Sequence, residues 1–138
     1  TLCLIYCSNS GLTESELRKL LAPLYDDQSF VELLPKMHWV KIYRQLKSFL
    51  ISTSNGKDEI FYFFHSSVEE VVKQMLLYDE DYEIDWHHKL ANHFIKSSEN
   101  NFRTADTILH HLVKGQMRDE IRAFFRNDPR SLRIGHTR

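Results

Sequence analysis

The spacing of apolar residues changes over residues 50–65, which read LISTSNGKDEIFYFFH. Two runs rich in β-branched and aromatic residues, 50–53 and 59–64, flank a short polar segment that contains Asn55-Gly56. An Asn-Gly pair favours a tight β-turn because both turn positions need positive φ, which these residue types tolerate best. The stretch therefore predicts two short antiparallel strands that form a β-hairpin.

Helices are predicted before the hairpin. Thr13 with Glu16 forms a capping box, which is typical of a helix N-terminus, and this helix should end before Pro23. Pro35 is typical of a first helical turn and opens the next helix. Apolar residues then recur every three or four positions, as in a helix with one buried face: Trp39, Ile42, Tyr43, Leu46, Phe49 and Leu50. The apolar run over residues 2–6 is too short for its periodicity to distinguish a strand from a buried helix.

If the N-terminal run is a helix, three helices followed by a hairpin is the element order of a winged-helix domain, in which the hairpin is the wing. We therefore expect a mainly α fold with a winged-helix domain over residues 1–77. Ser66 with Glu69, or Ser67 with Glu70, predicts a further capped helix after the hairpin. We expect the apolar stripe of that helix to face the core: Val68, Val71, Val72, Met75 and Leu76.

Residues 78–138 predict a small antiparallel helical extension. An acidic connection is expected from Tyr78 to Glu83, followed by three helices from Asp85 onward that are joined by short loops. Gly115 is the expected C-cap of the second of these helices. The extension is a possible start of a helical-repeat region, although it is too short to show a repeat period.

Composition limits the partners of this chain. Its 138 residues carry 18 Lys and Arg against 19 Asp and Glu, so no general attraction to nucleic acid or to anionic membranes is expected. No apolar stretch is long enough to span a membrane. Cys3 and Cys7 are interpreted as small buried residues of a reducing, cytoplasmic protein, with half of a metal site as the alternative. The apolar start without Met suggests a fragment of a larger protein.

The chain is predicted not to be an enzyme. Its 4 glycines do not lie in a phosphate-binding loop motif: Gly11, Gly56, Gly115 and Gly135. No nucleophile with an adjacent base is visible in the sequence, so no catalytic residues are predicted. Nucleotide hydrolysis by this chain alone is not expected.

Histidine is frequent, with 8 residues, and two adjacent pairs stand out: His87-His88 and His110-His111. Neighbouring residues on a helix point about 100° apart, so neither pair can hold one ion by itself, and a site on one helix needs a spacing of three or four. Only pairing between helices would bring ligands together. We therefore predict hydrogen-bonded or solvated histidines and no metal site.

Basic residues on the third helix and on the wing suggest an alternative function in DNA binding, because that helix reads DNA in many winged-helix proteins. They are Lys36, Lys41, Arg44, Lys47 and Lys57, with no acidic residue between Pro35 and Lys57. The alternative is a solvated helix face, or a surface that pairs with the acidic segment Tyr78–Asp85. Nucleic-acid binding is therefore the less favoured of the two interpretations.

Three segments resemble the winged-helix part of STAND-type NTPases: GLTESEL at 11–17, LLP at 33–35 with Trp39, and FFHSS at 63–67. They are most similar to NACHT proteins that continue into WD or tetratricopeptide repeats, such as telomerase- and vault-associated and nephrocystin-like proteins. HHKLA at 87–91 and HHLV at 110–113 resemble the helical segment that follows the winged helix in that group.

The resemblance implies that this chain lies C-terminal to an ATP-binding core and packs against its bound ADP or ATP. A Met-His-Asp motif of the family supplies a histidine that contacts a nucleotide phosphate, and Phe64-His65-Ser66 stands at that position. Carried over, His65 is the candidate nucleotide-sensing residue; alternatively it is a buried, hydrogen-bonded residue. Phe64 and Ser66 depart from the motif, although Ser66 should still cap the next helix.

The predicted function is a non-catalytic regulatory module that links the NTPase core to C-terminal repeats of the same polypeptide and to other proteins of a large assembly. ADP or ATP would belong to the parent protein, and this chain itself needs no cofactor. Two alternatives remain: a winged-helix DNA-binding domain, and a purely structural scaffold segment.

Overall fold

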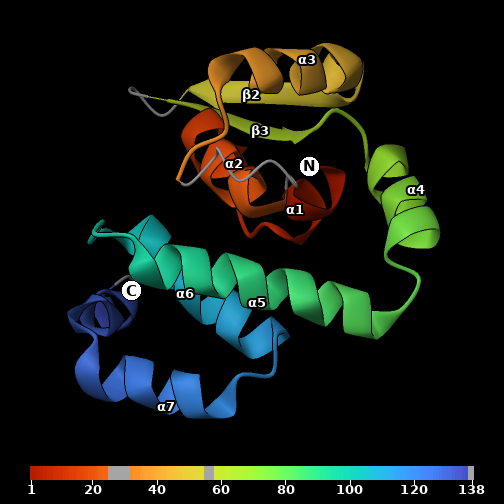
Figure 1. Ribbon diagram of the computed structural model, residues 1–138. Helices are drawn as coiled ribbons and strands as arrows, with labels where there is room; N and C mark the ends of the chain where they lie inside the picture. The colour runs from red at the N-terminus through yellow and green to blue at the C-terminus, as the bar shows by residue number, and fades with distance from the viewer. Residues whose placement is uncertain (25–31, 55–57, 137–138) are drawn as a thin grey trace. The chain divides into compact units, whose positions relative to one another are not determined.

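A computed structural model describes residues 1–24, 32–54 and 58–136. The chain folds as two compact units, residues 1–78 and residues 79–138, and each is mainly helical (Figure 1). None of the helices in the described residues is long and apolar enough to cross a membrane.

The first unit combines helices with a small antiparallel sheet. Its elements are α1 (Leu2–Cys7), β1 (Leu12–Thr13), α2 (Glu14–Leu21), the 3-10 turn η1 (Ala22–Leu24), α3 (Lys36–Leu46), η2 (Lys47–Phe49), β2 (Leu50–Ser54), β3 (Glu59–Phe63) and α4 (Ser66–Leu76). The N-terminal run is thus a helix, which settles the ambiguity of its sequence pattern.

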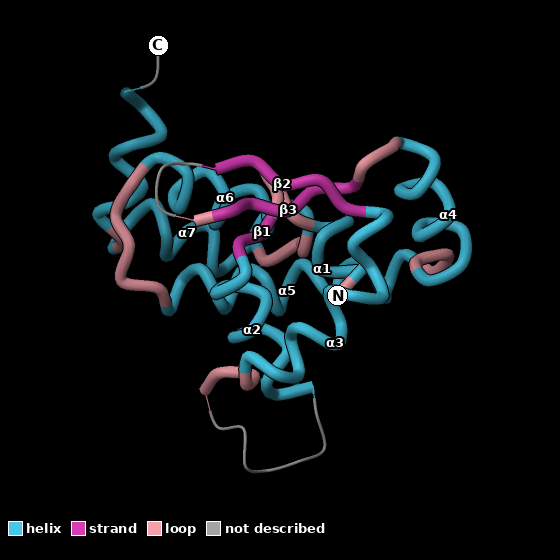
Figure 2. Tube along the Cα trace, turned by 90° about the horizontal axis from the view of Figure 1, so that it is seen from above, coloured by secondary structure: helices cyan, strands magenta, loops and turns pink. Residues whose placement is uncertain are grey.

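The predicted hairpin is confirmed. Strands β2 and β3 are antiparallel, with Leu50 opposite Phe63 and Ser54 opposite Glu59, while the turn residues 55–57 lie outside the described residues. The sheet also contains β1, so that β3 lies between β1 and β2 (Figure 2). The sequence did not predict β1, because a strand of two residues carries no periodic signal.

Gly11 makes the approach of β1 to β3 possible. Its φ is +75°, a left-handed conformation that glycine adopts without steric cost. A Cβ atom at this position would lie 2.6 Å from Cγ2 of Ile60 and 2.7 Å from the carbonyl oxygen of Phe61. The short strand therefore depends on a glycine immediately before it.

Capping and packing hold α2 and α3 in place. The predicted helix start is confirmed, since Thr13 Oγ1 accepts a hydrogen bond from the Glu16 N–H at 3.1 Å. The chain before α3 is tied to α2, because Arg18 Nε donates to the Leu34 carbonyl at 2.8 Å. Trp39 of α3 is buried and packs against Phe61 of β3, with ring centroids 5.8 Å apart. Tyr43 of α3 packs against the same ring at 5.6 Å, so two aromatic residues anchor this helix to the sheet.

The second unit consists of α5 (Glu80–Lys96), α6 (Phe102–Lys114), α7 (Arg118–Asn127) and the 3-10 segment η3 (Pro129–His136). The predicted acidic connection is wrong: Asp79 is the N-cap of α5, and its Oδ1 accepts from the Asp81 N–H at 2.9 Å. The acidic residues that follow occupy the first turn of the helix, where they stabilise the positive end of the helix dipole.

Helix α6 ends at its predicted C-cap, Gly115, but the left-handed residue is Gln116 with φ 56°. Met117 N–H donates to the Leu112 carbonyl at 2.9 Å and Gln116 N–H to the Val113 carbonyl at 3.1 Å, which is a Schellman motif. Gly115 instead leaves room for the side chain of His88. A Cβ atom there would lie 2.8 Å from Cδ2 of His88, whose Nε2 is 2.6 Å from the Gly115 carbonyl oxygen.

Candidate interaction site at the start of helix α4

His65 is the N-cap of α4. Its backbone is extended, and its Nδ1 accepts a hydrogen bond from the Ser67 N–H at 3.1 Å and lies 2.9 Å from Ser67 Oγ. The expectation that Ser66 caps this helix is therefore wrong. The imidazole does what a Ser or Asp side chain usually does at this position, because its Nδ1 lone pair reaches the second N–H of the helix.

The cap determines the chemistry of the other ring nitrogen. Because Nδ1 accepts from a backbone N–H, the neutral ring carries its proton on Nε2. His65 is exposed, so the alternative of a buried residue is wrong, and none of the described residues forms a hydrogen bond with Nε2. The site therefore presents one N–H donor at a helix N-terminus, where backbone N–H groups and the helix dipole favour an anion.

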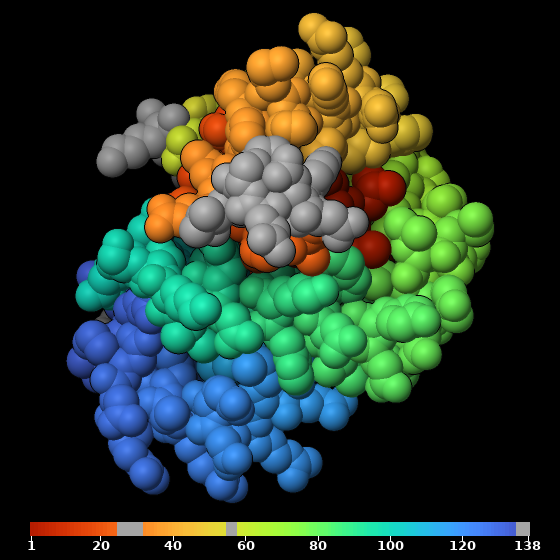
Figure 3. Space-filling view, viewed as in Figure 1, coloured from red at the N-terminus to blue at the C-terminus, as the bar shows by residue number. Residues whose placement is uncertain are grey.

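An apolar surface on α4 accompanies this donor. Val72 is buried and Val68 half-buried, but the side chains of Val71, Met75 and Leu76 are 56%, 70% and 45% exposed. The prediction that all five face the core is therefore wrong for three of them, because α4 packs on α1 and β3 along a narrow stripe only. We call Val71, Met75 and Leu76 the α4 apolar surface; Figure 3 shows this helix, in yellow-green, at the surface.

Phe64, immediately before His65, is 66% exposed. Phe64 thus adds an exposed aromatic side chain just before a helix that already exposes Val71 and Met75. Exposed apolar groups that lie close together are typical of interaction sites. The start and one side of α4 are therefore the best candidate in the first unit for contact with another protein body.

The basic residues named as a DNA-binding surface have different surroundings. Lys41, Arg44 and Lys47 are exposed on α3 and η2. Lys36 is not an isolated cation, because its Nζ lies 2.7 Å and 3.0 Å from the two carboxylate oxygens of Glu14. Lys57 lies outside the described residues. Of the five cations, three are therefore exposed on α3 and η2, one is ion-paired and one lies outside the described residues.

Two of the histidines singled out from the sequence meet inside the second unit. His87 of α5 and His111 of α6 are buried, and their Nδ1 atoms lie 2.9 Å apart. Burial, together with the charges of nearby histidines, lowers the pKa of His87 to about 4 and that of His111 to about 3. Cys7 is buried as expected and Cys3 half-buried, and neither forms a disulfide within the described residues.

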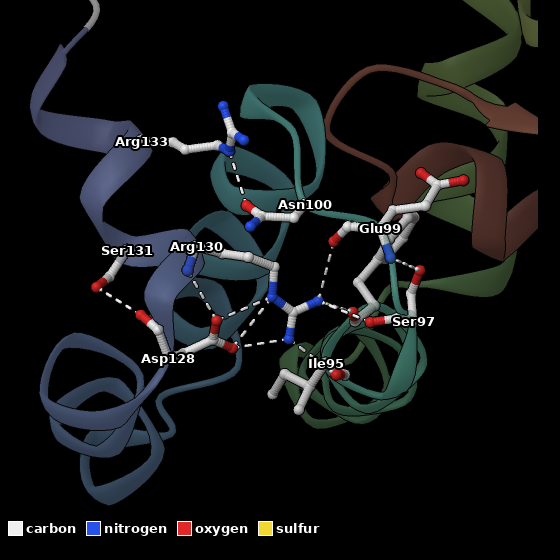
Figure 4. Close-up of polar contacts among 9 residues, drawn as sticks. Ile95, Ser97, Glu99, Asn100, Asp128, Arg130, Ser131 and Arg133 are labelled. Carbon is white, nitrogen blue, oxygen red and sulfur yellow. Dashed lines mark hydrogen bonds and ion pairs between the residues drawn. The ribbon is translucent and has the colours of Figure 1, made fainter.

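A polar cluster around Arg130 is a feature that the sequence did not reveal (Figure 4). The guanidinium is buried, and its NH1 donates to the carbonyls of Phe94 and Ser97 at 3.0 Å and 2.9 Å, while NH2 donates to that of Ile95 at 2.9 Å. These carbonyls belong to the last turn of α5 and its C-cap, Ser97, where helical carbonyls lack the usual partner four residues on; that of Phe94 also accepts from the Ser97 N–H at 3.2 Å. Arg130 therefore caps α5 from a segment more than 30 residues further along the chain.

Asp128 completes this cluster. Its carboxylate accepts from Arg130 Nε at 2.9 Å and from NH2 at 2.7 Å, and these hydrogen bonds lower the pKa of the carboxyl. Both residues border a groove of about 600 Å³ with apolar walls from Ile95 and Phe124. Because both charged groups are saturated by each other and by backbone, we interpret the cluster as structural.

Comparison of the chain with protein-family models, with curated proteins and with solved structures finds no match.

Proposed function

We propose that the chain is a non-catalytic regulatory module of a larger STAND (NACHT) NTPase, with its first unit acting as a winged helix. The element order supports this proposal, because three helices precede a β-hairpin and a further helix follows it. The observation that carries the proposal is the exposed imidazole of His65 at the N-terminus of α4, beside an exposed apolar surface.

In this proposal, the α4 apolar surface packs on the nucleotide-binding core, and Nε2–H of His65 donates to a phosphate of bound ADP. Glu69 and Glu70 are also exposed near the start of α4, so the site attracts an anion through directed hydrogen bonds and not through net charge. Loss of this contact on nucleotide exchange would release the module as a rigid body and transmit the change to C-terminal repeats. The compartment would be the reducing cytoplasm.

Two substitutions separate nucleotide sensing from helix capping. His65→Asn keeps a good N-cap but removes the outward N–H donor, whereas His65→Ala removes both. In the parent protein we expect both variants to weaken ADP binding by about tenfold or more, as for loss of a hydrogen bond to a charged group. In the 138-residue chain only His65→Ala should lower stability, by about 1 kcal/mol.

Isothermal titration with ADP and urea unfolding measure these two effects. ADP affinity that is unchanged in both variants would favour a purely structural scaffold over a sensor. A parent protein with no phosphate-binding lysine before Thr1 would contradict the proposal as a whole.

DNA binding is the second candidate, favoured by the exposed cations Lys41, Arg44 and Lys47 on neighbouring turns. It predicts duplex binding that weakens steeply with salt and is reduced by Lys41→Ala with Arg44→Ala. The ion pair of Lys36 with Glu14 counts against it, because one of the five cations is already neutralised. Absence of duplex binding at low salt would rule it out.

A further inference from the structure

Three histidine side chains come together between α5 and α6. His87 projects from α5, and His110 and His111 project from α6; one ligand nitrogen of each lies within 4.8 Å of the other two. The ring centroid of His87 lies 5.1 Å from that of His111 and 5.8 Å from that of His110. The rings of His110 and His111 are themselves 5.0 Å apart, so two adjacent histidines of α6 and one histidine of the facing helix α5 form a single cluster.

The cluster is built into the core of the second unit. His111 is fully buried, His87 is 6% exposed and His110 is half-buried, so the site is enclosed on the side of His111 and open on that of His110. Desolvation favours the neutral form of a buried imidazole, which is the form that binds metal ions. Nε2 of His111 is buried and has no hydrogen-bond partner among the described residues. Among the described residues, the three imidazoles are thus joined by one hydrogen bond, between His87 and His111.

Charged groups of both signs surround the cluster. Glu83 lies one turn before His87 on α5 and Asp106 one turn before His110 on α6, and each acts electrostatically on that ring. Lys114 acts on both rings in the opposite sense. Carboxylates one turn away from imidazole ligands are the usual groups that orient them or fill a further coordination position.

We propose that His87, His110 and His111 form a three-imidazole binding site for a divalent transition metal ion, Zn²⁺ in particular. At Zn–N distances of about 2.0–2.1 Å, ligand nitrogens of a tetrahedral site lie about 3.3 Å apart. The present separations, 2.9 Å between two Nδ1 atoms and up to 4.8 Å within the set, bracket that value. In a tetrahedral site with these three ligands, the fourth position would be left for water or a carboxylate.

A bound ion would link α5 to α6 through residues that are more than 20 positions apart in the chain. It would therefore stabilise the second unit by mass action, as any ligand that binds only the folded state does. The proposal does not depend on the proposed function. It departs from the expectation of no metal site, because the sequence does not show which histidines of different helices meet.

The first experiment uses the whole 138-residue chain after removal of metal by a chelator. Zn²⁺ titration, followed by calorimetry, should show one ion bound per chain and a rise in the melting temperature, while Mg²⁺ should have no effect because it prefers oxygen ligands. Co²⁺ should give the strong visible absorption of a four-coordinate site. Absence of stoichiometric Zn²⁺ binding would overturn the proposal.

Variants locate the ion. His110→Ala is the informative change, since His110 is half-buried and outside the buried imidazole pair, so the metal-free fold should persist. We expect it to weaken Zn²⁺ binding by at least about tenfold and to abolish the cobalt absorption. His38→Ala is the matched control, because His38 of α3 is also half-buried but lies in the first unit, and it should change neither.

Unchanged Zn²⁺ affinity in His110→Ala would overturn the proposal. A second readout does not need a variant: in ¹⁵N–¹H spectra of the imidazole nitrogens, Zn²⁺ should shift the signals of His87, His110 and His111 alone. Shifts confined to other histidines would show adventitious surface binding and would also overturn it.

Discussion

At three helix ends, a side chain takes a role that another residue type usually fills. His65 caps the N-terminus of α4 with a ring nitrogen, Gln116 adopts the left-handed conformation after α6, and Arg130 caps the C-terminus of α5 from a distant segment. His65 and Arg130 each carry a functional group that the usual capping residue lacks. For His65 that group is an N–H donor that points away from the helix, which is the basis of the proposed nucleotide contact.

Gln116→Gly should stabilise the chain by up to about 1 kcal/mol. A non-glycine residue in the left-handed region has a steric cost of about 1–2 kcal/mol, and glycine avoids it at the expense of some unfolded-state entropy. The neighbouring Gly115→Ala is the matched comparison and should destabilise, because its Cβ would lie 2.8 Å from His88. Urea unfolding measures both; destabilisation by Gln116→Gly would contradict this account.

At the scale of helices, two contacts join segments that are distant in sequence. Hydrogen bonds from the Arg130 guanidinium to the Phe94 and Ile95 carbonyls tie η3 to the end of α5, and the His87–His111 hydrogen bond joins α5 to α6. In both cases a buried polar group is held by partners on another element. Removal of one partner is therefore costly, because the other is left buried and unsatisfied.

Arg130→Lys should destabilise the second unit by about 2 kcal/mol or more, since a lysine cannot bond a carboxylate and several carbonyls at once. The pKa of Asp128 is lowered by Arg130, so the unfolded state binds more protons in acid. Stability due to this pair is present above the usual carboxyl pKa of 3.8 and is lost as pH falls from there through the lowered value. Asp128→Asn should remove this acid dependence in urea titrations at several pH values.

Metal-free protein should also lose stability as pH falls below about 6.5, the ordinary histidine pKa, toward the values of about 4 for His87 and about 3 for His111. In this window the unfolded state binds protons that the folded state excludes, which costs about 1.4 kcal/mol per pH unit for each histidine. The titratable and charged groups that act on the two rings come from both helices: Glu83, His88, His110 and Lys114. Equal unfolding free energies at pH 7 and pH 5 would contradict this prediction.

At the scale of the whole molecule, the two units have different features. The first carries an exposed apolar surface on α4 next to a polar donor, and the second carries a buried imidazole cluster and a saturated Arg–Asp pair. The first is suited to contact with another protein body, and the second to a rigid support. This division agrees with the proposed role as a link between an NTPase core and repeat domains.

Replacement of Val71 and Met75 by Gln should change the unfolding free energy of the isolated chain by less than about 0.5 kcal/mol, because both side chains are more than half exposed. In the parent protein the same change should weaken the contact with the NTPase core and raise basal activity. Val72→Ala, which is buried on the same helix, is the contrasting control and should destabilise the chain itself. Unchanged basal activity of the Gln variant would contradict the proposed docking face.

The sequence by itself determined the features that depend on residues a few positions apart. Thr13 with Glu16 marked the start of α2, the Asn-Gly segment marked the hairpin, and Gly115 marked the end of α6. Hydrogen bonds and steric limits within one turn or one hairpin decide these features, so their signals lie in adjacent letters. The start of α4 belongs to the same group, although the sequence pattern placed the cap on Ser66 and the structure places it on His65.

Only the tertiary structure decided the rest. The pairing of β1 with β3, the exposure of one side of α4, the capping of α5 by Arg130 and the meeting of His87 with His111 all depend on which elements pack together. Packing joins residues that are 24 to 36 positions apart in the last two cases, and no local spacing encodes such a contact. For this reason the histidine cluster was invisible as a site until two helices placed its members around one point.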